Sequence, residues 1–190
     1  GNLTLSNMYG NEIAVVVGDY LLALVLRALN SERDHVLVGR LLETSQELGL
    51  GVIEEVLNRN NFVLSIEKYY DIIYLKTASL FSLCCALGGY LAMSEQIGAG
   101  ALPARGEPSD RRAGTGSAPT HVNNLAKAYG KALGLAFQVV DDLLDLTADS
   151  VTTGKPAMND IREGRITLPV IHALLADPVR TKELIATCQA

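Results

Sequence analysis

The chain has 190 residues, a formal net charge of -5 and 48% hydrophobic residues, with no Trp. This length fits one domain and is sufficient to bury a core, which the composition predicts to be aliphatic rather than aromatic. The negative charge argues against nucleic acid or an anionic membrane surface as the main partner.

Two long helices are predicted in the first third of the chain. Residues 12–29 are apolar nearly all round, which is typical of a helix at the centre of a helical domain. Asp19 in this stretch is either a hydrogen-bonded core carboxylate, the interpretation we favour, or a residue of a functional site. The leucine pattern of residues 32–58 predicts the second helix.

A third helix is predicted from Ser65, which we interpret as its N-cap, to Gly88 and Gly89. Lys76 is unusual in this otherwise apolar helix. Because burying an unpaired ammonium group is costly, its side chain must reach solvent, pair with an acid or meet an anionic ligand.

The apolar runs 13–26 and 72–92 approach the length of a membrane span, but charged residues interrupt both. We therefore expect buried helices in a protein that is not transmembrane. Cys84, Cys85 and Cys188 lack metal-ligand spacing and are expected to be buried, reduced thiols. Such thiols indicate an intracellular protein, in the cytoplasm or in an organelle such as the mitochondrion, although no targeting segment can be read.

Residues 98–120 contain five Gly and three Pro among interspersed charges, which predicts a flexible insertion loop. Helical periodicity resumes at about residue 122 and continues through Thr147. Two further helices are predicted, at about residues 168–176 and from Pro178 onward. No stretch predicts a strand, so the expected fold class is all-α.

The helix predicted to end at Thr147 carries three carboxylates on one face. At about 100° per residue, Asp141, Asp142 and Asp145 share an arc with Gln138, opposite an apolar face. Their repulsion costs roughly a few tenths of a kcal/mol per pair, and a bound cation would remove that cost. Mg²⁺ is usually held by one or two carboxylates with substrate phosphates and waters, so this face is a candidate Mg²⁺ site. The alternative is a solvated acidic face.

Residues 154–171 follow the acidic helix and bring Lys155, Arg162 and Arg165 close in sequence to its carboxylates. Cations beside a metal site suit a polyphosphate ligand. Two separate kinds of residue, acidic and basic, therefore indicate the same class of ligand.

At this point the chain resembles the trans-polyprenyl diphosphate synthases. The matching elements are GDYLL at 18–22, KTA at 76–78, GLAFQVVDDLLD at 134–145, GKP at 154–156, ND at 159–160 and EGRITLP at 163–169. Each element alone is a weak signal, whereas the ordered set is highly specific and covers nearly the whole chain.

The resemblance implies a single domain over residues 1–190, built as a bundle of long helices around a central cavity and usually dimeric. It implies a Mg²⁺-dependent prenyltransferase that condenses isopentenyl diphosphate with an allylic diphosphate and releases diphosphate. The partners implied are these two substrates and a second subunit, either identical or from a related synthase.

The resemblance also assigns roles to individual residues. The second aspartate-rich motif of the family, which binds Mg²⁺, is matched by Asp141, Asp142 and Asp145. Catalytic roles at the reacting end of the allylic substrate fall to Lys76, Thr77 and Gln138. Binding of the substrate diphosphate falls to Lys76, Lys155, Asp160 and Arg165.

The chain departs from the family pattern in three places. The first aspartate-rich motif is expected upstream of Gly10, and the basic residues that hold isopentenyl diphosphate are expected earlier still. We therefore expect a chain that lacks the N-terminal part of its domain and is incomplete for activity alone. The sequence GVIEE at residues 51–55 replaces the common GExxQ, so one acid is lost and another gained. Product length cannot be read, because the residues that set it lie near the first motif.

Two other functions stay open. The first is a non-catalytic regulatory subunit that pairs with a complete synthase, although such a subunit has no chemical need for an intact DDxxD motif. The second is a terpene cyclase, which shares the ionisation chemistry. The second metal motif of cyclases usually mixes Asn, Ser or Thr with Glu, so the all-Asp motif disfavours this alternative.

Overall fold

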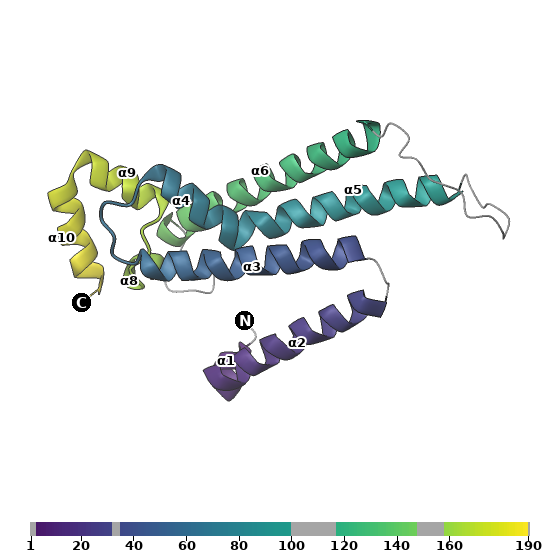
Figure 1. Ribbon diagram of the computed structural model, residues 1–190. Helices are drawn as coiled ribbons and strands as arrows, with labels where there is room; N and C mark the ends of the chain where they lie inside the picture. Colours follow the sequence, from purple (N-terminus) through teal and green to yellow (C-terminus); the bar gives the residue numbers. More distant parts are fainter. Residues whose placement is uncertain (1–2, 32–34, 100–116, 148–157, 190) are drawn as a thin grey trace. The chain divides into compact units, whose positions relative to one another are not determined.

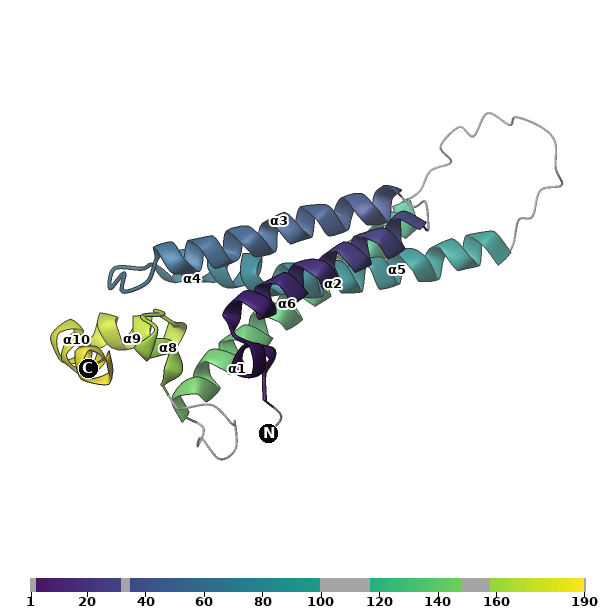
Figure 2. The same ribbon diagram turned by 90° about the horizontal axis from the view of Figure 1, so that it is seen from below.

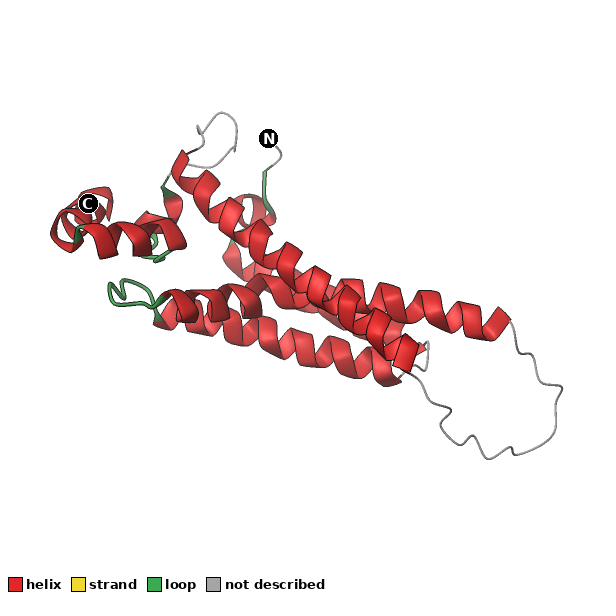
Figure 3. Ribbon diagram, turned by 90° about the horizontal axis from the view of Figure 1, so that it is seen from above, coloured by secondary structure: helices red, strands yellow, loops and turns green. Residues whose placement is uncertain are grey.

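The computed structural model describes residues 3–31, 35–99, 117–147 and 158–189. Within these ranges the regular elements are helical and none is a strand, which confirms the predicted all-α class (Figure 3). The chain divides into two units, Gly1–Glu43 and Thr44–Ala190.

The first unit contains α1 (Leu5–Tyr9), α2 (Asn11–Ser31) and the beginning of α3 (His35–Leu57). Gly10, with a φ of 86°, separates α1 from α2. The prediction that α2 is buried is not met, because Val15 and Val16 are more than 60% exposed and Asp19 is exposed as well. The five residues of α1 are too few to cover the 21 residues of α2.

The second unit contains the rest of α3, followed by α4 (Ile66–Ile73), a π-helical turn (Tyr74–Ala78), α5 (Ser79–Ala99) and α6 (Ser117–Thr147). Ser65 caps α4 as predicted, since its Oγ accepts a hydrogen bond from the backbone N–H of Lys68 at 3.1 Å. The long helices α5 and α6 pack along each other (Figures 1 and 2).

Both ends of the predicted loop 98–120 are helical. The preceding helix continues past Gly88 and Gly89 to Ala99, because a helix-interior Gly costs only about 1 kcal/mol relative to Ala. Helix α6 begins at Ser117, five residues earlier than predicted, with Pro119 in its first turn, where Pro is tolerated. Residues 100–116, the centre of the predicted loop, lie outside the described part of the chain.

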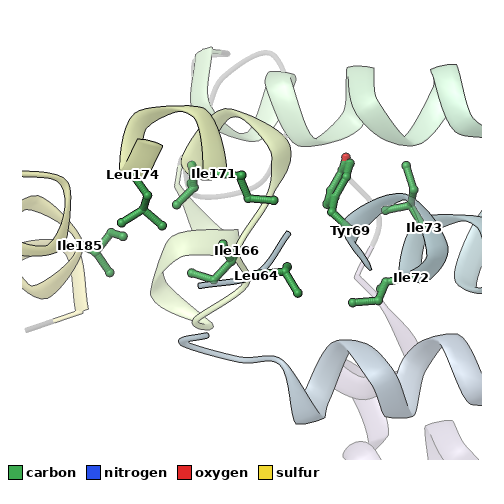
Figure 4. Close-up of a cluster of buried hydrophobic side chains, with 9 residues drawn as sticks. Leu64, Tyr69, Ile72, Ile73, Ile166, Ile171, Leu174 and Ile185 are labelled. Atoms are coloured by element: carbon green, nitrogen blue, oxygen red, sulfur yellow. The ribbon is translucent and has the colours of Figure 1, made fainter. Parts of the chain in front are cut away.

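The C-terminal part forms α8 (Asn159–Arg162), α9 (Leu168–Ala176) and α10 (Pro178–Gln189), and the last two match the predicted helices. A cluster of buried side chains joins this part to the segment around α4 (Figure 4). Its members are Leu64, Tyr69, Ile72, Ile73, Ile166, Val170, Ile171, Leu174 and Ile185. The cluster therefore brings the segment before α5 and α6 into contact with the segment that follows them.

Two predictions about apolar segments can be compared with the structure. Cys84 is exposed and Cys85 and Cys188 are half-buried, so the expected burial of the thiols is wrong, and all three are free of disulfides.

Among the described residues, one helical run, Ile66–Ala92, is long and apolar enough to cross a membrane. Core helices of soluble proteins meet the same criterion, and several residues of this run pack in the buried cluster.

Candidate active site

The π-helical turn Tyr74–Ala78 carries Lys76 and Thr77. It inserts one extra residue into an otherwise continuous helical run, so that the backbone N–H of Ser79 bonds to the carbonyl of Tyr74. The Ser79 hydroxyl also donates to the carbonyl of Leu75, at 2.8 Å. Such π-turns are rare in proteins and occur frequently at functional sites.

Two glycines allow neighbouring helices to touch the backbone of this turn. A Cβ placed on Gly51 of α3 would lie 2.3 Å from the backbone N of Lys76. A Cβ placed on Gly134 of α6 would lie 2.6 Å from the Cα of Ala78. Both distances are too short for any side chain, so the turn is held between α3 and α6 by direct backbone contact.

A series of hydrogen bonds, part-buried at its first bond and buried at the others, runs from the π-turn across α6 to α4. Thr77 Oγ1 donates to Gln138 Oε1 at 2.7 Å, and Gln138 Nε2 donates to Asp142 Oδ1 at 2.8 Å. The Tyr69 hydroxyl donates to the other oxygen of Asp142, also at 2.7 Å. In Figure 4 the Tyr69 hydroxyl points toward α6. Because Gln138 both accepts and donates, its amide orientation is fixed by its two neighbours.

Burial is the main cause of the shifted pKa values of Asp142 and Tyr69. Asp142 is 5% exposed, and this burial raises the pKa of its carboxyl above the usual value, while the hydrogen bonds from Gln138 and Tyr69 act in the opposite direction. Burial and the adjacent Asp142 charge raise the pKa of Tyr69, so its hydroxyl stays protonated and remains a donor. Gln138 and Tyr69 therefore compensate the carboxylate for its lost solvation.

Lys76 pairs with an acid, one of the three outcomes expected for it. Its Nζ lies 2.5 Å from Glu55 Oε1, and the two side chains are 26% and 19% exposed. Glu55 had no predicted role and is the new acid in the GVIEE sequence of α3. Its appearance at a position where the family often has Gln was the available signal, but nothing local to the sequence identified its partner.

Asp145, unlike Asp142, is turned toward the segment that follows it. Its two carboxylate oxygens accept hydrogen bonds from the backbone N–H groups of Asn159 at 3.2 Å and Asp160 at 3.0 Å. A carboxylate at this position accepts hydrogen bonds from the first turn of α8, where a negative charge is favourable. The carboxylate therefore holds the backbone of Asn159 and Asp160 against the end of α6.

Asp160 and Arg165 form an ion pair beside this cap, with Arg165 Nη1 2.8 Å from Asp160 Oδ1. Arg165 Nη2 also contacts Glu163 Oε2. Burial, with the Asp145 charge, raises the pKa of Asp160, and Arg165 opposes this rise. Arg165 therefore balances acids of its own segment.

These side chains surround one cavity of about 150 Å³. Its polar lining consists of Glu55, Asn58, Tyr69, Lys76, Gln138, Asp141, Asp142, Asp160, Arg165 and Thr167. Six predicted site residues are thus brought together: Lys76, Gln138, Asp141, Asp142, Asp160 and Arg165. Thr77 joins them through Gln138 and Asp145 through Asp160, whereas Lys155 lies outside the described residues.

The three aspartates of the motif differ in their availability to a cation. Within the described residues, no three His, Cys, Asp or Glu side chains converge into a metal-binding group. Asp142 and Asp145 are engaged by the hydrogen bonds above, but the exposed Asp141 makes one weak contact in the described chain, 3.5 Å from Gln138 Nε2. Mg²⁺ that takes one or two carboxylates with phosphate oxygens and waters fits Asp141 at the cavity edge. The full set of three ligands stays a prediction.

Comparison with known proteins assigns the chain to a family. The sequence matches the Polyprenyl synthetase family over residues 1–102 and 112–190, so the chain belongs to that family. It is 30% identical to the geranylgeranyl diphosphate synthase of Mycobacterium tuberculosis over 194 residues, which covers 100% of this chain and 49% of the relative. It is 29% identical to the octaprenyl diphosphate synthase of Escherichia coli, covering 98% of this chain and 50% of the relative.

Solved structures agree with this assignment. The crystal structure of a geranylgeranyl pyrophosphate synthase from Lactobacillus brevis matches with a TM-score of 0.77 and 26% identity. That match covers 100% of this chain and 52% of the other. The chain thus spans about half the length of the relatives it matches.

Proposed function

We propose that this chain belongs to a prenyltransferase that joins isopentenyl diphosphate to an allylic diphosphate and forms a trans-polyprenyl diphosphate. The observation that carries the proposal is the continuous polar chain from Thr77 through Gln138 to Asp142, beside Lys76 and the DDxxD face in one cavity. Relatives named as synthases of such diphosphates support the choice of substrates.

The charged residues of the cavity bind the diphosphate and the metal ion. Lys76 binds the diphosphate of the allylic substrate, and its positive charge stabilises the negative charge that builds up when the C–O bond breaks. Asp141, with the other two aspartates of its motif as predicted ligands, holds Mg²⁺, which when bound neutralises the leaving diphosphate. Lys155 is proposed as a second diphosphate ligand from the sequence alone.

The neutral residues face the hydrocarbon side of the reaction. Thr77 and Gln138 are held in place by their mutual hydrogen bond and by the bond from Gln138 to Asp142. Their oxygens therefore cannot move to react with the positive charge that develops on the allylic carbon. The double bond of isopentenyl diphosphate attacks the allylic carbon as the diphosphate leaves with the bonding electron pair. Loss of a proton then restores a double bond in a product five carbons longer.

Binding of inorganic diphosphate in the presence of Mg²⁺, measured by titration calorimetry, tests the site. We expect Asp141→Asn and Lys76→Gln each to weaken binding at least about tenfold, since each removes a charge that contacts the ligand or its metal. Two matched controls, Asp71→Asn at an exposed carboxylate and Lys68→Gln at a half-buried ammonium, alter charges of α4 outside the cavity and should leave the affinity unchanged. Equal effects in both pairs would contradict the proposed site.

Incorporation of labelled isopentenyl diphosphate separates the enzyme from the regulatory subunit. Assayed with the upstream segment supplied, which the chain is expected to need, an enzyme yields a labelled, longer product whose formation is lost in Asp141→Asn. A non-catalytic subunit yields none under the same conditions and instead changes the product length of a complete synthase mixed with it. The proposed assembly, a homodimer or a heteromer with a related synthase subunit, is measured on the same samples by light scattering.

A further inference from the structure

Glu55 lies between Lys76 and Arg165, the two basic side chains that line the cavity in the described part of the chain. One of its carboxylate oxygens, Oε1, holds Lys76 Nζ at 2.5 Å. The other, Oε2, lies 3.9 Å from Arg165 Nε, beyond hydrogen-bond distance. A single carboxylate thus bonds to one cation and stops short of the other.

Arg165 has a donor available to receive this carboxylate. Its two terminal nitrogens are engaged by Asp160 and Glu163, but its Nε is buried and has no hydrogen-bond partner within the described chain. A buried donor without an acceptor is unfavourable by about 1–3 kcal/mol, so a shift of Glu55 toward Arg165 would be favourable on that side.

A substrate diphosphate competes with Glu55 for Lys76. Besides Glu55, the cavity is lined by three carboxylates, those of Asp141, Asp142 and Asp160. A diphosphate that arrives while Glu55 remains on Lys76 meets a neutralised cation and a repelling anion. Binding therefore needs Glu55 to leave, and Arg165 Nε, 3.9 Å from Glu55 Oε2 and without a partner in the described chain, is placed to donate a hydrogen bond to it.

We propose that Glu55 is an exchangeable counter-ion, which holds Lys76 until a diphosphate displaces it, moves to Arg165 Nε while the diphosphate is bound, and returns when the diphosphate leaves. The inference rests on the proposed function, in which Lys76 binds diphosphate. Glu55 acts through Lys76 and is a positioning residue, not a catalytic one. Its effect is to lower the affinity for diphosphate and to speed product release.

The test compares Glu55→Gln with Glu54→Gln in the calorimetric assay with Mg²⁺ and inorganic diphosphate. Gln keeps the shape of Glu55 and an acceptor for Lys76 but removes the charge. We expect diphosphate to bind about fivefold more tightly to Glu55→Gln, which corresponds to releasing a partly exposed ion pair. Glu54 pairs with Lys68 at 2.8 Å outside the cavity, so Glu54→Gln should not change the affinity.

A second measurement follows the other half of the exchange. The NMR signal of the Arg165 Nε–H, assigned by its loss in Arg165→Lys, should shift on addition of Mg²⁺ and diphosphate as the group gains an acceptor. In Glu55→Gln the shift should be much smaller, because the incoming carboxylate is gone. A purely structural role of Glu55 would not produce this difference, and circular dichroism verifies that the variants are folded.

The outcomes separate the two proposals. If the unmodified chain binds diphosphate but Glu55→Gln binds it equally or less tightly, or the Arg165 signal does not move, the exchange is overturned and the proposed function stands. If neither the unmodified chain nor Glu55→Gln binds, the proposed function fails and the exchange fails with it. Binding by Glu55→Gln alone would support the exchange.

Discussion

The substitution Gly51→Ala tests whether backbone contact between α3 and the π-turn builds the site. The added Cβ would lie 2.3 Å from the backbone N of Lys76, 2.7 Å from its Cα and 2.8 Å from the carbonyl carbon of Leu75. All three atoms are main-chain atoms and cannot rotate away. Since such atoms normally approach to about 3.5 Å, α3 and the turn must separate by about 1 Å.

The magnitude follows from two opposing effects. Overpacking of this kind costs about 1–3 kcal/mol, and against main-chain atoms we expect the upper end of that range. Replacing a helix-interior Gly by Ala returns about 1 kcal/mol. The net loss is about 2 kcal/mol, which lowers the melting temperature by roughly 4–8 °C in a protein of this size. Because the turn carries Lys76, affinity for Mg²⁺-diphosphate should fall as well.

Gly49→Ala is the matched control on the same helix. A Cβ at Gly49 meets nothing within 4 Å, so the substitution should raise the melting temperature through helix propensity alone. Thermal unfolding followed by circular dichroism compares the two variants. Opposite signs would support the reasoning, whereas stabilisation by Gly51→Ala comparable to that by Gly49→Ala would refute it.

Three further predictions concern the surroundings of the cavity. Tyr69→Phe removes a buried donor from Asp142 and should lower the free energy of unfolding by about 1–3 kcal/mol in urea titrations, whereas Tyr70→Phe, at a more exposed neighbouring ring, should have little effect; equal losses would show that the hydroxyl bond is unimportant. Because the pKa of Asp142 is raised in the folded chain, its ionised form opposes folding. The stability of the unmodified chain should therefore fall, relative to that of the non-titrating Asp142→Asn, as the pH rises through the raised pKa; a difference independent of pH would contradict this. Gly164→Ala should destabilise by about 1–2 kcal/mol, since φ is 75° and the new Cβ would lie 2.8 Å from Asn60 Oδ1, and unchanged thermal unfolding would show that the loop adapts.

Features that depend on neighbours within one or two helical turns can be predicted from the sequence alone. Helical periodicity and the absence of strand patterns predicted the all-α class, and Ser65 was recognised as the N-cap of α4. The spacing of Gln138 from Asp142 placed both on one helix face, where they form a direct hydrogen bond. Such contacts follow from backbone geometry that the spacing already fixes.

Local signals also failed where packing overrides propensity. Gly88 and Gly89 suggested a helix end, but α5 continues through them, with Gly89 close to Ala126 of α6. The π-turn at Lys76 left no recognised pattern in the sequence, because it arises where Gly51 and Gly134 bring two helices against one backbone. Propensity describes a helix alone, and these features belong to three helices in contact.

The partner of each charged or polar side chain of the cavity depends on how the helices pack. Tyr69 reaches Asp142 across 73 positions of sequence, and Lys76 reaches Glu55 across 21. Asp145, indistinguishable by pattern from Asp142, is directed to the backbone of α8 instead. The residue type defines how many hydrogen bonds a side chain can donate or accept. Its actual partner depends on which helices pack together, and the local spacing of residues does not contain that information.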